Sequence, residues 1–180
     1  PMQAQLWVVD RLVRERQLYL VPYSVRLSGR LDVPALARAL ERLEVRHAAL
    51  RLRFEERDDG SLLQTVAAPA TVSLEVLDVH EDDVAPERLT ARVASSPLEL
   101  AGRPWRATLL RLETHEHVLL WTLHHIVTDG WSMGVLFREL AALYALETGG
   151  PAPGSAPDLG PAGREFLGWC AAQAAPAATA

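Results

Sequence analysis

Two adjacent histidines, His124 and His125, are the residues of this chain best suited to chemistry near neutral pH. The ordinary pKa of imidazole lies close to neutrality, so a histidine can both accept and release a proton there. Asp129 and Gly130 follow within six positions. Titratable groups at this spacing, beside a glycine that permits close backbone approach, predict a site for proton transfer.

The neighbouring sequence predicts how these residues are held. An apolar run over 118–123 is typical of a strand, and the periodic apolar residues over 131–147 predict a helix. Neighbouring side chains of a strand point to opposite faces, so His124 and His125 should have different roles. One would face a substrate channel while the other packs inside. The start of the following helix would favour developing negative charge.

Two other interpretations of the histidines remain open at this point. A histidine at the end of a strand often has only a structural role, with its polar atoms satisfied internally. A metal site built from His124, His125 and Asp129 is disfavoured, because the sequence lacks two histidines at helical spacing around a glutamate and has no nearby cysteine. We therefore expect no metal.

Composition narrows the class of protein. The 180 residues suffice for one domain, and 49% apolar with 23% charged residues is ordinary for a globular protein. The net charge of −5 argues against a nucleic-acid partner, and the apolar runs are too short to span a membrane. A single cysteine, Cys170, allows no internal disulfide and favours a cytoplasmic setting.

The rest of the chain predicts an α/β fold with helices packed on a mostly antiparallel, mixed sheet. Trp131 and Met133 are expected in the core, and His115 and His117 in solvent. The apolar stretch 5–9 runs into a charged segment, 10–17. We expect strands at 18–27, 49–55, 62–66, 74–79, 105–112 and 117–123, and helices from the Asp32 cap to about His47, at 86–95, at 131–147 and at 164–173, with a Pro/Gly-rich segment at 149–161 and a disordered tail at 174–180.

These motifs together resemble the condensation domain of nonribosomal peptide synthetases, in its N-terminal half. The segment 124–132 matches the family's signature of two histidines, three spacers and Asp-Gly. Chloramphenicol-acetyltransferase-like enzymes share that feature, but the upstream segment 46–51 with Phe54 makes the resemblance to the synthetases much more specific. The segments 29–32 and 6–12 also match in order and spacing, although Gln5 and Ala48 depart from the usual residues.

The resemblance implies a fold and a domain organisation. The family fold pairs two chloramphenicol-acetyltransferase-like lobes around a tunnel. Residues 1–148 would form the N-terminal lobe, and residues 149–180 a crossing loop, a short helix and a tail. The second lobe would be absent from this chain, which is then not expected to be active alone.

The resemblance also implies a mechanism, an acyl transfer that makes an amide bond. Upstream and downstream carrier proteins would present both substrates on phosphopantetheine arms, with no cofactor bound directly. His125 would face the tunnel as base or positioner of the amine, and His124 would be its structural neighbour. Asp129 would hold the loop through an ion pair with Arg46 or Arg51, and Gly130 would keep the tunnel open.

Two alternatives stay open beside this function. The chain could be a stand-alone acyltransferase that uses a soluble acyl thioester and completes its cleft by oligomerising. It could also be a lobe that docks carrier proteins without doing chemistry.

Overall fold

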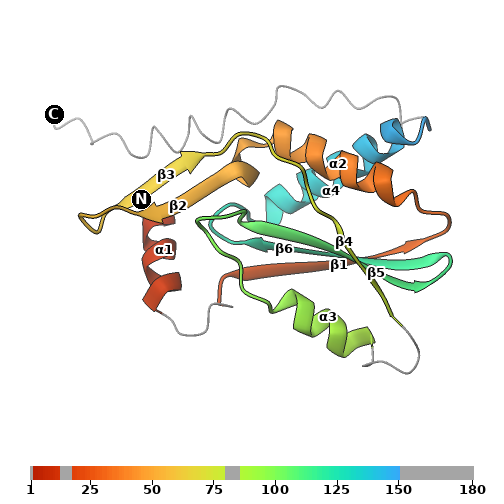
Figure 1. Cartoon of the computed structure of the whole chain (residues 1–180), viewed down its shortest axis with the longest axis horizontal. Helices are drawn as coiled ribbons and strands as arrows, with labels where there is room; N and C mark the ends of the chain where they lie inside the picture. The colour runs from red at the N-terminus through yellow and green to blue at the C-terminus, as the bar shows by residue number, and fades with distance from the viewer. Residues whose placement is uncertain (1, 13–17, 80–85, 151–180) are drawn as a thin grey trace.

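A computed structural model of the chain describes residues 2–12, 18–79 and 86–150. Figure 1 shows how the elements of this part are arranged. In chain order they are α1 (Met2–Leu12), β1 (Leu20–Ser28), α2 (Val33–Arg46), the 3-10 helix η1 (Ala48–Arg51), β2 (Leu52–Glu56), β3 (Leu62–Val66), β4 (Glu75–Asp78), α3 (Pro86–Ala94), β5 (Trp105–Glu113), β6 (Glu116–His124) and α4 (Gly130–Glu147).

The main sheet has the strand order β1-β6-β5-β4. β6 pairs antiparallel with β1 on one side and with β5 on the other, whereas β4 is parallel to β5. β2 and β3 form a separate antiparallel hairpin. This topology confirms the expected mixed, mostly antiparallel sheet.

Helices cover both faces of the sheet, with α2 and α4 side by side on one face and α3 on the other (Figure 1). The alternation of β6 explains the two layers, since successive side chains of a strand point to opposite faces. Leu119, Trp121 and Leu123 pack in the main core with apolar residues of α2 and α4. Leu120 packs in a smaller cluster with Leu89 of α3.

The start and end of α2 agree with the sequence prediction. The Asp32 carboxylate accepts a hydrogen bond from the backbone N of Ala35 at 2.8 Å, and Pro34 lies in the first turn. A side-chain cap satisfies a backbone donor that the helix cannot, and proline needs no such partner there. The helix ends at Arg46 with His47 as its C-cap.

Two segments near the N-terminus differ from the expectation. The expected strand 49–55 begins only at Leu52, because residues 48–51 form the 3-10 turn η1, which redirects the chain from α2 into β2. The apolar stretch 5–9 belongs to helix α1, for which no element was predicted. Trp7 is the buried residue of this helix and packs on Leu52 and Phe54 of β2.

His117 is buried, and the expectation that it is solvated is wrong. It has the same parity on β6 as Leu119 and Trp121, so it faces the layer of α2 and α4. Its Nδ1 has no hydrogen-bond partner among the described residues. His115, in the turn between β5 and β6, is exposed as expected.

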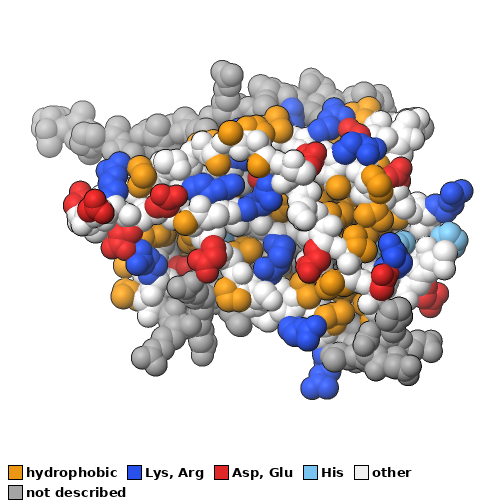
Figure 2. All heavy atoms as spheres, in the orientation of Figure 1, with side chains coloured by type: hydrophobic (Ala, Val, Ile, Leu, Met, Phe, Trp, Pro, Cys, Tyr) orange, Lys and Arg blue, Asp and Glu red, His pale blue; other side chains and the backbone are white. Residues whose placement is uncertain are grey.

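Figure 2 shows acidic and basic side chains interspersed with apolar surface on the face in view, with neither charge sign forming a continuous stripe. Within the described ranges, no helix is long and apolar enough to cross a membrane. The expected helix 164–173, the tail 174–180 and residues 151–161 of the Pro/Gly-rich segment lie outside the described residues.

Candidate functional site

The histidine pair lies where β6 ends and a short loop leads into α4. The backbone N of His124 donates to Pro104 O at 2.9 Å, which continues the sheet to its last residue. The backbone N of His125 donates to Tyr19 O at 2.8 Å. The backbones of both histidines are therefore fixed by hydrogen bonds to neighbouring segments. The two residues differ in the surroundings of their side chains.

His124 is turned inward and is only 1% exposed. Its Nδ1 accepts a hydrogen bond from the backbone N of Ile126 at 3.1 Å, so the ring proton must lie on Nε2. Nε2 then donates to Asp10 Oδ1 at 3.3 Å. Burial lowers the pKa of His124, and the hydrogen bond to Asp10 opposes this only in part. These contacts indicate that the His124 ring is neutral and carries its proton on Nε2.

His125 is turned outward and is exposed. Its Nδ1 lies 2.7 Å from the carbonyl oxygen of Thr128, which can only accept, so Nδ1 carries the proton. The lone pair of a neutral ring is then on Nε2, which forms no hydrogen bond with any of the described residues. An exposed, oriented Nε2 can accept a proton from a bound molecule.

Asp129 caps α4 and does not form the ion pair expected with Arg46 or Arg51. Its Oδ1 accepts a hydrogen bond from the backbone N of Ser132 at 2.7 Å, and its backbone is extended, as is usual for an N-cap. Hydrogen bonds from Ser132 lower the pKa of Asp129, although burial works in the opposite direction. The backbone N–H groups at the start of α4 need an acceptor, and the side-chain carboxylate of the neighbouring Asp129 supplies one locally.

The two arginines bind other groups. Arg46 Nε lies 2.8 Å from Oε2 of Glu139, a buried residue of α4 whose same oxygen lies 2.7 Å from His47 Nε2. Arg51 donates to backbone oxygens, among them Ala67 O at 2.8 Å. Arg46 thus joins α2 to α4, and Arg51 joins η1 to the residue that follows β3. They are not brought to the loop that carries His125.

A family model described as Condensation domain matches residues 1–158 of the chain. The chain belongs to the condensation domain family. It is 42% identical over 153 residues to nonribosomal peptide synthetase kk1B of Curvularia clavata, an alignment that covers 84% of the chain and 1% of that synthetase. It is 39% identical over 155 residues to cyclosporin synthetase simA of Tolypocladium inflatum, covering 84% and 1% respectively.

Solved structures of condensation domains have the same fold. The first condensation domain of the calcium-dependent antibiotic synthetase, in complex with a substrate analogue, superposes with a TM-score of 0.74 at 28% identity. The match covers 96% of this chain and 42% of that one. This condensation-domain chain thus spans less than half of the solved domain and a very small part of the curated synthetases.

The start of α4 leaves the histidine site of this condensation domain open. Gly130 is exposed, and a Cβ added to it would meet no atom within 4 Å. Trp131 is 85% exposed, so the expectation that it packs in the core is wrong, whereas Met133 is buried as expected. Residue 131 lies on the outer side of the first turn, while Met133 lies on the side that faces the sheet.

Sequence reasoning missed the contribution of α1 to this site. Gln3 Nε2 donates to Ile126 O at 2.9 Å, and Trp7 shares an apolar cluster with Ile126 and Val127. Asp10, the partner of His124, completes the set. The sequence did carry a signal for this contribution: residues 3, 7 and 10 have helical spacing, which places them on one face of a helix.

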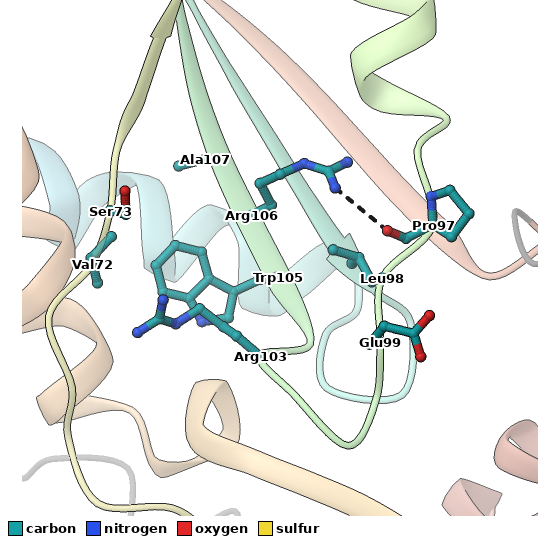
Figure 3. A pocket seen from close by; sticks show the side chains of 9 residues that line it. All are labelled: Val72, Ser73, Pro97, Leu98, Glu99, Arg103, Trp105, Arg106 and Ala107. Atoms are coloured by element: carbon teal, nitrogen blue, oxygen red, sulfur yellow. Dashed lines mark hydrogen bonds between the residues drawn. The ribbon is translucent and has the colours of Figure 1, made fainter.

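A depression of about 270 Å³ lies elsewhere, at the start of β5 (Figure 3). Its two arginines already have partners: Arg103 binds Glu44, and Arg106 donates to backbone oxygens that include Val93 O. No group of three or more His, Cys, Asp or Glu side chains that could hold a metal occurs within the described ranges. The nine lining residues are Val72, Ser73, Pro97, Leu98, Glu99, Arg103, Trp105, Arg106 and Ala107.

Proposed function

We propose that this chain contributes His125 to amide-bond formation in nonribosomal peptide synthesis. An amine nitrogen attacks the carbonyl carbon of an acyl thioester, the C–N bond forms, and the C–S bond breaks. The nitrogen loses a proton and the departing thiolate gains one. The reaction therefore needs a group near the amine that can accept or hold a proton.

The observation that carries this proposal is the state of the His125 ring. Thr128 O holds the proton on Nδ1, so Nε2 offers its lone pair at an exposed position. Nε2 can take the amine proton, or it can orient the amine by accepting a hydrogen bond. Holding the reactants in line contributes to the rate in either case, by up to about 7–11 kcal/mol in favourable systems.

The partners of the reaction follow from the same proposal. Two carrier proteins would present the acyl and aminoacyl groups as thioesters on phosphopantetheine arms, so this chain itself would bind no cofactor. The names of the synthetases that resemble the chain support this assignment. The single cysteine supports a cytoplasmic setting.

We further propose that residues 1–148 act as the N-terminal lobe and that a second lobe closes the site. The 42% coverage of the solved condensation domain and the exposed Trp131 in the first turn of α4 support this organisation. Without the second lobe, water would surround the reacting groups and weaken the electrostatic stabilisation of the oxyanion. The chain alone would then dock carriers but not condense their substrates at multiple turnover.

The test is His125→Ala in the complete condensation domain that includes this chain, supplied with two loaded carriers. Amide product, measured by mass spectrometry, should be lost while the melting temperature is unchanged. His115→Ala is the matched control, since His115 is also exposed but lies in the turn between β5 and β6. Product formation by His125→Ala at the rate of the control would refute the role of His125.

A further inference from the structure

One face of helix α1 contacts the loop that carries the histidine pair. Gln3, Trp7 and Asp10 are spaced by four and three residues, so they lie on the same side of the helix. Gln3 binds the carbonyl of Ile126, Trp7 shares an apolar cluster with Ile126 and Val127, and Asp10 binds His124.

The contact of Asp10 determines which ring nitrogen of His124 carries the proton. The carboxylate is a hydrogen-bond acceptor, so it favours the ring with its proton on Nε2. Nδ1 is then left as an acceptor for the backbone N of Ile126. With the opposite tautomer, two N–H groups would face each other at Nδ1, and the carboxylate would face a lone pair.

The loop transmits this arrangement to His125. The backbone N of Val127 donates to His124 O at 3.0 Å, and Thr128 O accepts from Nδ1 of His125 at 2.7 Å. The carbonyl that orients the His125 ring is therefore one residue beyond a segment fixed by α1 and His124. A loop that loses the Ile126 hydrogen bond would release this carbonyl.

We propose that Asp10 is a positioning residue for His125, acting through the tautomer of His124 and the turn over residues 126–128. The effect of Asp10 on the His125 ring can be measured on this chain alone. Its effect on the reaction rate rests on the proposed function. The side chain of Asp10 is 12% exposed and that of His124 is 1% exposed, so water cannot readily replace the carboxylate.

Other contacts hold α1 in place independently of Asp10. Trp7 packs against Leu52 and Phe54, and Arg11 forms an ion pair with Glu56 of β2 while its guanidinium lies 5.0 Å from the centre of the Trp7 ring. Removing the Asp10 carboxylate should therefore leave α1 docked. The effect of the variant can then be assigned to the histidines.

The first experiment measures the ring-nitrogen shifts of the chain labelled with 15N-histidine. In the parent chain, His124 should show the Nε2–H form and His125 the Nδ1–H form. Asp10→Ala should shift both rings toward averaged tautomers. Asp10→Asn should retain the parent spectrum, because its amide oxygen can still accept from Nε2. Val8→Ala, a half-exposed position on the same helix, is the control.

Two results would overturn the proposal. One is the opposite tautomer of either histidine in the parent chain, a measurement that needs no variant. The other is a folded Asp10→Ala chain whose His124 and His125 shifts equal those of the Val8→Ala control. A merely structural role for Asp10 would lower the melting temperature without moving these shifts.

The second experiment measures amide formation by the complete condensation domain. By analogy with the outer partners of metal-bound histidines, Asp10→Ala should lower kcat about ten- to a hundredfold, with little change in KM. Asp10→Asn should recover most of the rate. Shifted tautomers with an unchanged kcat would overturn the catalytic part of the proposal. Full activity of His125→Ala would instead refute the proposed function and leave the tautomer result standing.

Discussion

Arg46 and Glu139 form an ion pair, with Nε and Oε2 2.8 Å apart, that joins the last turn of α2 to the middle of α4. The side chains are 17% and 9% exposed, and His47 lies 2.7 Å from the same carboxylate oxygen. A buried carboxylate needs such partners, because an unpaired charge in the interior is strongly unfavourable. Arg46 is thereby held on the inner side of the helix pair.

Asp129→Ala should destabilise the chain only by the loss of a helix cap, about 0.5–2 kcal/mol. Neither Arg46 nor Arg51 loses a partner, since Asp129 accepts from Ser132, Arg46 binds Glu139 and Arg51 donates to backbone oxygens. Asp129→Asn should recover most of the loss, since asparagine caps as well as aspartate. Denaturant unfolding of the three chains checks this. A loss of about 3–5 kcal/mol in Asp129→Ala would instead indicate a buried ion pair.

Arg103→Ala should destabilise the chain by about 3–5 kcal/mol. Its guanidinium binds both carboxylate oxygens of Glu44, a residue that is 1% exposed, at 2.8 and 3.2 Å. The variant would remove the cation that is hydrogen-bonded to this buried carboxylate. Arg111→Ala is the matched control, because its partner Asp78 is 53% exposed and such surface pairs contribute about 0–1 kcal/mol. Equal losses in the two variants would contradict the burial argument.

Protonation of His124 should destabilise the fold as the pH falls. Burial lowers the pKa of the folded form below the ordinary value of about 6.5, so the unfolded chain binds more protons between the two values. The contribution of His124 is then complete above about pH 6.5 and is lost as the pH decreases toward the folded pKa. Thermal unfolding of the parent and of His124→Asn at several pH values checks this. The melting temperature should fall more steeply with decreasing pH in the parent than in the variant. Parallel profiles would show that His124 is not buried as a neutral ring.

Trp131→Ala should leave the stability of the chain unchanged to within about 0.5 kcal/mol, as for other surface substitutions. Trp131 is 85% exposed, whereas Trp121 lies in the core at 1% exposed. Trp121→Ala is the contrasting variant and should cost about 3–5 kcal/mol through lost burial and a cavity. Chemical denaturation of both variants checks the difference. A large loss in Trp131→Ala would show that this indole packs against the chain.

The sequence by itself determined the elements that depend on local patterns. The Asp32 cap predicted the start of α2, and apolar periodicity predicted α4. It also predicted that His124 and His125 face opposite ways, because adjacent strand residues always do. Such features depend only on residues that lie close together in the sequence.

Only the tertiary structure decided which distant groups meet. Asp10 and His124 are 114 positions apart, and Arg46 and Glu139 are 93 positions apart. Their pairing depends on where α1 docks and on how α2 lies against α4, which no local pattern encodes. The same holds for Trp131 and His117: apolar or polar character predicts a preference for burial, but the register of packed elements decides which side chain faces the core.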